Sequence, residues 1–450
     1  MFKIIGLQNG IVLQRDDTNH CDSWITLTDA WDMDVTVDIG ILTETENSGK
    51  GRRFHLTGIC TGGPYTLTLS VGEETVIFTD IYVGDVWILG GQSNMDGCGY
   101  YNKTLADYVP SEAIRFYSTD EQWKTGEPRL HQNYKSKDEY VKRKLGYPTE
   151  TWQDRGVGPG YAFAKAMHER TGAPQGLISC AIAGSGLIQW DPDAPREPEP
   201  NFYGITLRRY EECGGNARGM FWYQGCSDTY PDGAEHFTDR MVHLFSSFRR
   251  DLRRADMAFV QVQIYQYRNA DQEADGIWNR IREAQRTLHE HIENMDTVAV
   301  TNAELADAIH LDSNTHKILG KNAAESMYRL CFDPYGRTST LAPQLDSILL
   351  VRGKATLAVR YKNLNGRLTS EGRATGYALS MSPDRLDRRH IVRIDLHGDT
   401  AWIQHELPVE ELHNAYLFYL FGNDSYANIT DEDGRPIPAM GPISLREYLE

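Results

Sequence analysis

The stretch DVWILGGQSNM at residues 85–95 decides the fold that we expect for this chain. A short hydrophobic run ends in two glycines, and a hydroxyl residue follows before a turn into a predicted helix. In open α/β sheets, ligands bind outside the carboxyl ends of the strands. Ser93 would then present a nucleophile to a cleft, beside backbone N–H groups that suit an oxyanion. A serine here is also typical of a helix N-cap, so both interpretations stay open.

Around that stretch, strand-like and helical patterns alternate. Short apolar runs recur at residues 86–89, 177–181, 220–223, 259–264 and 298–300, and helical patterns cover 160–169, 235–254 and 276–290. Strands that alternate with helices are typical of βαβ units and a parallel sheet. We therefore predict an α/β domain over residues 81–335.

Both flanks of this domain have the pattern of β structure. Strand-like alternation or short strand-like runs occur at residues 35–39 and 65–71 before it, and at 348–351, 356–361, 391–394 and 415–419 after it. Turn-forming residues separate these runs. We predict a β-rich N-terminal domain over residues 1–80 and a β-sandwich-like C-terminal domain over residues 336–450.

The composition excludes several classes of protein. The 46 Lys and Arg residues are outnumbered by 63 Asp and Glu, which gives a net charge of −17. A general nucleic-acid binder or a polybasic membrane-surface protein needs the opposite balance. No apolar run approaches the ~20 residues that span a bilayer. We expect neither a nucleic-acid partner nor a membrane partner.

The N-terminus and the cysteines both favour an intracellular protein. The apolar start MFKIIGL at residues 1–7 is interrupted by polar residues 8–10, and it is too short for a signal-peptide core. The seven cysteines are odd in number and scattered, which predicts reduced thiols. We expect a cytoplasmic protein, or a secreted or periplasmic one if a leader has been removed.

A second motif that could take part in catalysis is DAIH at residues 307–310. A carboxylate three residues before a histidine can fix the imidazole tautomer, so that the ring acts as a general base. A surface loop whose histidine caps the next helix has the same pattern, and Asp312 is a competing partner for His310. The spacing of His310, Asp312 and His316 matches no helical pair of metal ligands, so we expect no metal site.

Two further motifs could supply oxyanion donors. The stretch FWYQG at 221–225 places Gln224 at a strand end, and AIAGSG at 181–186 places Gly184 after an apolar strand. A carboxamide N–H and a backbone N–H are fixed, neutral donors. Each residue also has an ordinary interpretation in turn or loop structure. A phosphate-binding loop is unsupported, because no third glycine follows in register.

Together, GQSNM (91–95), WYQG (222–225) and DAIH (307–310) resemble the SGNH/GDSL hydrolase superfamily, specifically its sialate O-acetylesterase-like carbohydrate esterases. The likeness extends into the flanks, at residues 9–15, 84–87, 281–285 and 428–430. It implies an SGNH-hydrolase-like (flavodoxin-like) parallel sheet with helices on both faces, flanked by N- and C-terminal β-rich domains.

The resemblance implies a role for each catalytic residue. Ser93 would be the nucleophile, His310 the general base and Asp307 its orienting acid. The backbone N–H groups of Ser93 and Gly184 and the side chain of Gln224 would form the oxyanion hole. This assignment requires the Ser93 hydroxyl and the His310 imidazole to become neighbours in the folded chain.

The resemblance also places Gln92, Asn94 and Trp190 at the substrate, although a core role suits Trp190 equally well. The chain departs from the family pattern, in which Glu-Ser-Asn more often follows WYQG. Here Cys226 and Asp228 stand in that stretch. Neither change removes a proposed catalytic atom, but both could alter the fit of the substrate.

These roles describe a serine esterase that removes O-acetyl groups from a carbohydrate without a metal or other cofactor. O-Acetylated sialic acid is the first expected substrate, with Arg155, Arg218 and Arg282 as candidates to bind its carboxylate. Two alternatives stay open: an esterase for acetylxylan or another plant glycan, and a non-catalytic carbohydrate-binding protein with a vestigial site. The sequence leaves the oligomeric state undetermined.

Overall fold

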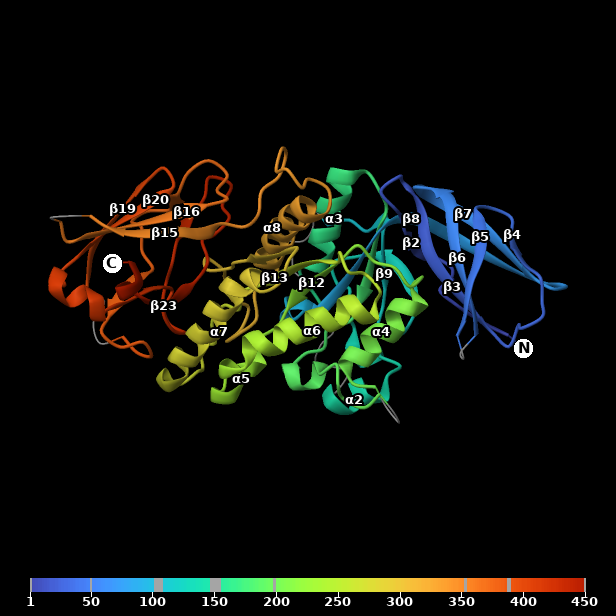
Figure 1. The fold of residues 1–450 in the computed structure, drawn as a ribbon, viewed down its shortest axis with the longest axis horizontal. Helices are drawn as coiled ribbons and strands as arrows, with labels where there is room; N and C mark the ends of the chain where they lie inside the picture. Colours follow the sequence, from blue (N-terminus) through green and yellow to red (C-terminus); the bar gives the residue numbers. More distant parts are fainter. Residues whose placement is uncertain are drawn as a thin grey trace. The chain divides into compact units, whose positions relative to one another are not determined.

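The chain forms two compact units. The computed structural model describes residues 2–48, 51–100, 108–145, 155–196, 200–351, 354–386 and 390–448 (Figure 1). The first unit consists of Met1–Trp222, Leu244–Phe259 and His316–Ala324, and the second of Tyr223–His243, Val260–Thr315 and Glu325–Glu450.

The first unit begins with an antiparallel sheet, coloured blue in Figure 1. Its strand order is β1 (Lys3–Ile5), β3 (His20–Thr28), β6 (Gly51–Cys60) and β5 (Ile41–Ser48). Along β3, buried positions such as Ile25 and Leu27 alternate with half-buried ones. This is the two-residue period of a strand that buries one face.

One long strand, β8 (Glu74–Gly91), continues from this β-rich region into the α/β region. Its first half pairs antiparallel with β7 (Gly62–Val71), which also pairs with β4 (Val35–Val37). From Ile81 to Gly91 every residue is buried, as expected for a strand covered on both faces. The predicted domain boundary at residue 80 therefore falls inside a continuous strand.

The second half of β8 belongs to a mixed sheet. β11 (Gln175–Ser179) is parallel to β8 and to β9 (Ser111–Tyr117), while β12 (Gly219–Tyr223) is another neighbour of β8. β2 (Val12–Gln14) is also parallel to β8. The predicted parallel sheet is present only in part: the sheet is mixed, because β7 joins β8, and β10 (Trp123–Gly126) joins β9, by antiparallel pairing.

Helices fill the connections between these strands. In the first unit they are α1 (Ser93–Asp96), α2 (Glu139–Leu145), α3 (Gly160–Thr171) and α4 (Phe202–Glu212), and α6 (Phe237–Asp251) and α8 (Ser313–Cys331) contribute residues to both units. α3 coincides with the helix predicted at 160–169. The predicted helix at 235–254 is divided at His236, between α5 (Pro231–Glu235) and α6.

A buried cluster of charges joins β2 to β8. The carboxylate of Asp85 is fully buried and accepts hydrogen bonds from Arg15 Nε at 2.9 Å and Arg218 Nε at 3.1 Å. The Gln14 side chain accepts the Val86 backbone N–H at 2.8 Å. The two arginines compensate a carboxylate that would be costly to bury alone. Arg218, a candidate to bind the substrate carboxylate, is thus hydrogen-bonded to Asp85 within the fold.

The second unit contains two further strands of the α/β region and a helix that connects them. β13 (Ala258–Val262) begins in the first unit and neighbours β14 (Met295–Val298), and α7 (Asp275–Thr287) lies between them in the chain. Arg282 of α7 is buried and donates to the carbonyl groups of Leu420 at 3.0 Å and Gly422 at 2.9 Å. Burial lowers its pKa to about 10. Arg282 therefore anchors the C-terminal region.

The C-terminal region is built from small antiparallel sheets, coloured orange and red in Figure 1. Their orders are β15 (Gln344–Leu350), β16 (Thr356–Lys362), β20 (Thr400–His405), β19 (Ile391–His397); β18 (Tyr377–Ser380), β21 (Tyr416–Tyr419), β23 (Met440–Ser444); and β17 (Thr369–Ser370), β22 (Ile429–Thr430). Short 3₁₀ turns lie at Asn133–Lys135, Leu187–Trp190, Cys226–Asp228, Gln272–Ala274, Leu288–Glu290, Val409–Asn414 and Leu445–Tyr448. The β structure expected after residue 335 is present.

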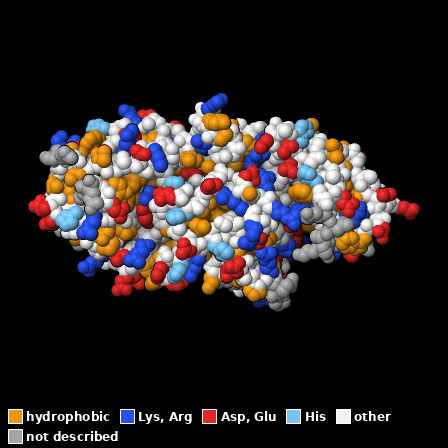
Figure 2. Space-filling view, in the orientation of Figure 1, with side chains coloured by type: hydrophobic (Ala, Val, Ile, Leu, Met, Phe, Trp, Pro, Cys, Tyr) orange, Lys and Arg blue, Asp and Glu red, His pale blue; other side chains and the backbone are white. Residues whose placement is uncertain are grey.

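The surface charge is mixed. On the face drawn in Figure 2, acidic and basic side chains are interspersed. Within the described ranges, no helix combines the length and apolar character needed to cross a bilayer.

Candidate active site

The proposed nucleophile lies where β8 turns into α1. β8 ends at Gly90 and Gly91, and Ser93 is the first residue of the one-turn helix α1. Gly90 is required by close packing, since a Cβ there would lie 2.7 Å from the Trp222 ring. Gly91 has φ of +121°, which a side chain would strain. The serine is thus held at the carboxyl end of a buried strand, as the sequence predicted.

The backbone of α1 leaves donors at the nucleophile. The N–H groups of Met95 and Asp96 both donate to the Gln92 carbonyl at 2.9 Å, and Gly97 N–H donates to the Ser93 carbonyl at 2.9 Å. The first N–H groups of a helix have no acceptor within the helix itself. The Ser93 N–H belongs to this first turn, which is compatible with its predicted place in an oxyanion hole.

The loop that carries Gly184 is hydrogen-bonded to the end of β8. Ile182 N–H donates to the Gly91 carbonyl at 3.0 Å, and the Ser185 hydroxyl donates to the same carbonyl at 3.3 Å. Gly184 has φ of +67°, in the left-handed region that glycine adopts most readily. Within the first unit, the structure therefore brings the loop of Gly184 and the turn of Ser93 to one edge of the sheet.

A buried carboxylate that the sequence analysis missed links these two segments. Asp96, the last residue of α1, accepts the backbone N–H of Ala183 at 3.1 Å, and Asn133 Nδ2 donates to the Ala181 carbonyl at 3.0 Å. Burial raises the pKa of Asp96 to about 7, although hydrogen bonds from Asn133 and Ala183 partly oppose that shift. Asp96 thus fixes the residue immediately before Gly184.

The substitution Asp96→Asn is expected to remove a pH dependence of stability. The folded-state pKa is about 7, against about 3.9 in an unfolded chain, so the folded state binds more protons between these values. The parent therefore loses stability as the pH rises from about 4 to 7, whereas Asn stays neutral. The variant should unfold at a higher temperature than the parent at pH 8, with a smaller difference at pH 4. Thermal unfolding at both pH values measures this, and an equal difference at both would contradict it.

Trp190 is a core residue. Its side chain is fully buried, its Nε1 donates to the Ser185 hydroxyl at 2.9 Å, and its ring packs edge-on against Trp222 with centroids 4.9 Å apart. No exposed ring face remains on which a sugar could stack. Of the two roles open for Trp190, the structure fits the core role. Gln92 and Asn94 are also largely buried, and their assignment to the substrate stays a prediction.

In the second unit, Asp307 and His310 form a hydrogen-bonded pair. Asp307 Oδ2 lies 2.9 Å from His310 Nδ1, and Oδ1 accepts the backbone N–H groups of Ile309 at 3.0 Å and His310 at 2.9 Å. Burial alone would raise the pKa of Asp307, but these hydrogen bonds hold it well below its usual range. An ionised carboxylate only accepts, so Nδ1 carries a proton, and in the neutral form of the ring Nε2 presents a lone pair.

The loop that holds this pair is closed by backbone hydrogen bonds. Ala306 N–H donates to the His310 carbonyl at 2.8 Å, and Arg268 N–H donates to the Ala308 carbonyl at 2.8 Å. The side chain of His310 is 17% exposed, which leaves the imidazole partly accessible. This geometry has the form of a base with its orienting acid.

Asp312, the competitor of Asp307, has a different task. It is the N-cap of α8, and its Oδ1 accepts the Thr315 backbone N–H at 2.7 Å. The bond satisfies one of the N–H groups that a helix start leaves without an internal partner. In the structure the carboxylate that is hydrogen-bonded to the His310 ring is therefore that of Asp307.

Gln224 is held by a carboxylate that the sequence analysis treated only as a departure from the family. Gln224 Nε2 donates to Oδ2 of Asp228, and the Gln224 carbonyl accepts from Gln285 Nε2 at 2.9 Å. Because a carboxylate only accepts, Asp228 fixes which end of the Gln224 amide is the donor. One of the two side-chain N–H bonds is thereby used within the protein.

The structure thus places the predicted residues in two groups. Ser93 lies with the Gly184 loop in the first unit, and Asp307 and His310 lie with Gln224 in the second. Their assembly into one catalytic centre stays a prediction. The polar residues that sequence reasoning missed are Asp96, Asn133 and Gln285. A carboxylate three positions after the serine was the available signal for Asp96.

Comparison with known proteins identifies the family. The chain is 28% identical to the Arabidopsis thaliana protein called "Probable carbohydrate esterase At4g34215" over 280 residues, which is 58% of this chain and 96% of that protein. The crystal structure of XAC1771, a carbohydrate acetylesterase from Xanthomonas citri, is 18% identical and covers 98% of this chain and 99% of its own. Its TM-score of 0.75 shows a shared fold.

The family described as "Carbohydrate esterase, sialic acid-specific acetylesterase" matches residues 83–329. The matched region contains residues 83–91 of β8, the Ser93 turn, the Gly184 loop and the loop of Asp307 and His310. Because the match extends over more than half of the chain, the protein belongs to this family of carbohydrate esterases.

Proposed function

We propose that the protein is a serine esterase that removes O-acetyl groups from a carbohydrate. The observation that carries the proposal is the Asp307–His310 pair, with its 2.9 Å hydrogen bond at Nδ1 and the lone pair that this leaves on Nε2. Membership of the carbohydrate esterases supports the substrate class. An SGNH-hydrolase-like arrangement of the sheet, with helices on both faces, is part of the proposal.

In the proposed mechanism, His310 Nε2 removes the proton from the Ser93 hydroxyl as its oxygen attacks the acetyl carbonyl carbon. The N–H groups of Ser93 and Gly184 and the side chain of Gln224 stabilise the oxyanion. His310 then protonates the leaving sugar oxygen as the ester C–O bond breaks. Water, activated by His310, attacks the acetyl-serine and releases acetate.

O-Acetylated sialic acid is the proposed substrate, and Arg155 is the proposed partner of its carboxylate. Arg155 stands two positions before Val157, which exchanges backbone hydrogen bonds of 3.0 and 3.2 Å with Gly99, three residues beyond α1. Arg155 also donates to the Tyr100 hydroxyl at 2.7 Å. This contact orients a guanidinium fork that suits a carboxylate.

The substrate assignment is tested by acetate release from O-acetylated sialic acid and from acetylated xylo-oligosaccharides. Arg155→Gln should lower kcat/KM for the sialate roughly 10- to 100-fold, the usual effect of a charge-assisted bond, and leave the neutral substrate unchanged. The matched control is Arg360→Gln, at an exposed arginine of β16 that pairs with Asp399 at 2.7 Å. Faster release from the xylo-oligosaccharides by the parent would transfer the assignment to acetylxylan.

A further inference from the structure

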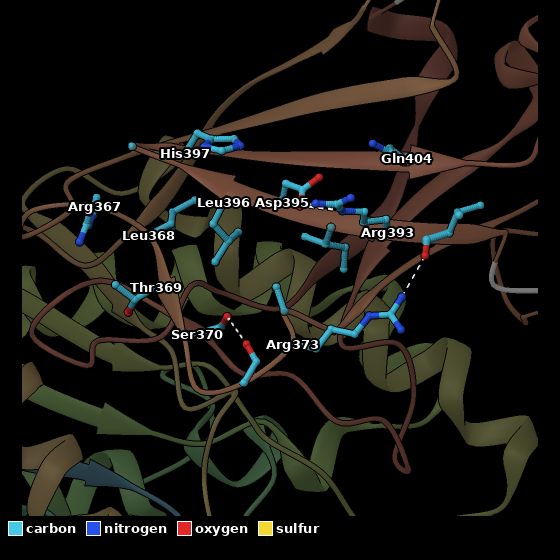
Figure 3. A pocket seen from close by; sticks show the side chains of 15 residues that line it. Arg367, Leu368, Thr369, Ser370, Arg373, Arg393, Asp395, Leu396, His397 and Gln404 are labelled. Atoms are coloured by element: carbon cyan, nitrogen blue, oxygen red, sulfur yellow. Dashed lines mark hydrogen bonds and ion pairs between the residues drawn. The ribbon is translucent and has the colours of Figure 1, made fainter.

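The C-terminal β region contains an open groove of about 880 Å³. One wall is β19 with the adjoining Gly398 and with Gln404 of β20, and the other wall is the segment 367–374, which includes β17 (Figure 3). The volume is in the range of pockets that hold small molecules. All of its lining belongs to the second unit.

The two walls are tied together. Leu368 N–H donates to the Gly398 carbonyl at 2.8 Å, and the Arg373 guanidinium donates to the Val392 carbonyl at 2.9 Å, drawn as a dashed line in Figure 3. Asn428 Nδ2 supports the second wall from behind, through the carbonyl of Arg373 at 3.0 Å. The groove is therefore formed before any ligand arrives, which lowers the entropic cost of binding.

The lining combines an apolar floor with neutral hydrogen-bonding groups. Leu368 and Ala374 are buried, and Leu396 is half-buried and points from β19 toward the opposite wall in Figure 3. The side chains of Thr369 and Gln404 also line the groove. Aliphatic surface beside hydroxyl and amide groups suits a pyranose ring, which has an apolar C–H face and a polar edge.

The charged groups of the groove are mainly cationic. Arg367 pairs with Glu432 at 2.9 Å, and Arg393 pairs with Asp395 at 2.8 Å. Arg373 differs from both, because its hydrogen bond goes to a carbonyl. Throughout the part of the chain that the structure describes, no carboxylate pairs with Arg373. An oriented guanidinium whose charge is not neutralised is a ready partner for an anion.

We propose that this groove is a second, non-catalytic binding site for an acidic saccharide, whose carboxylate binds Arg373 and whose ring lies on Leu396. The protein carries a net charge of −17, so a local cationic groove is needed to hold an anionic sugar against the overall repulsion. The carboxylate could belong to a sialic acid or to a hexuronic acid. The inference does not depend on the esterase mechanism, because binding needs no turnover.

The test is calorimetric titration of the full chain carrying Ser93→Ala, so that no ester is consumed. The probes are sialyllactose, trigalacturonate, neutral lactose and inorganic phosphate. Arg373→Gln should weaken binding of the acidic sugar roughly 10- to 100-fold. Arg393→Gln leaves Asp395 without its counter-charge in the groove and should weaken binding less. Arg360→Gln, on the same four-stranded sheet but outside the groove, should not weaken it. Hydrolysis of a small acetyl ester should be unchanged by Arg373→Gln in the otherwise native chain.

The outcomes separate the interpretations. Loss of one acidic-sugar site in Arg373→Gln, with a smaller effect of Arg393→Gln and unchanged thermal unfolding of both variants, supports the proposal. The preferred probe then identifies the sialate or uronate source. Equal affinity of the parent and Arg373→Gln, or no affinity for either acidic sugar, would overturn it. Phosphate that displaces the sugar with similar affinity would overturn the saccharide assignment in favour of a general anion site. An inactive parent that still shows Arg373-dependent binding would reject only the esterase mechanism.

Discussion

Replacing Ser93 by alanine is expected to reduce acetate release at least ~10³-fold, with kcat rather than KM carrying the loss. The hydroxyl is the only group that forms the covalent intermediate in the proposed mechanism, and members of a triad act as a unit. The measurement is steady-state hydrolysis of a generic acetyl ester by both proteins. The result also decides between an esterase and a carbohydrate-binding protein with a vestigial site.

The control for this substitution is Ser70→Ala, which makes the same chemical change at a serine of β7. It should leave the rate unchanged. A serine-directed phosphonate gives an independent readout, since it should label Ser93 in the parent and nothing in the variant. Equal rates for the parent and Ser93→Ala would remove the enzyme interpretation. Labelling of a different serine would keep the chemistry but move the nucleophile.

Asp307→Asn is expected to cost roughly 10³- to 10⁴-fold in kcat, because the carboxylate holds the Nδ1–H tautomer of His310 and stabilises the imidazolium that forms. The shape of the amide preserves the turn, since its oxygen can still accept the N–H groups of Ile309 and His310. The depressed pKa of Asp307 keeps it ionised in mildly acidic buffer. Its stabilising effect is thus present above the unfolded pKa of about 3.9 and is lost only as the pH falls through the lower folded value.

Asp312→Asn is the matched control, five positions along the chain. Asn is about as good an N-cap as Asp, so the helix α8 should be retained and kcat should change little. The pair of variants therefore separates the carboxylate on the imidazole from the one on the helix. A larger loss of kcat in Asp312→Asn than in Asp307→Asn would assign the orienting acid to Asp312.

Much of the fold was readable because apolar periodicity reflects burial directly. The runs at 86–89 and 220–223 lie within β8 and β12, and the helical pattern at 160–169 became α3. α4 was missed, because its N-terminal turn contains Gly204 and Thr206, which are poor helix formers, and its N-cap Asn201 follows a Pro-rich stretch. The antiparallel members of the large sheet were missed because strand direction depends on long-range pairing, which leaves no local pattern.

The candidate site shows the same division between local and long-range information. The Asp307–His310 contact spans three residues, so the spacing indicated it as one possibility, and the family resemblance favoured it over a surface loop. The role of Asp228 was not predicted, because its carboxylate reaches the Gln224 amide only through the 3₁₀ turn that follows Gln224. Asp96 was overlooked for a related reason: its spacing from Ser93 was visible, but a carboxyl group in a polar stretch gives no sign that it will be buried.

The charge cluster at Asp85 bears on where the esterase begins. The family match starts at residue 83, yet one guanidinium that neutralises the buried carboxylate belongs to Arg15, and β8 itself starts at Glu74. A chain that began at residue 81 would lack Arg15, so the Asp85 carboxylate would keep only one of its two arginine partners. Removing one partner from a buried ion pair costs about 3–5 kcal/mol. The leading β strands are therefore part of the scaffold of this family domain, and a variant in which other strands replace them must supply a replacement cation.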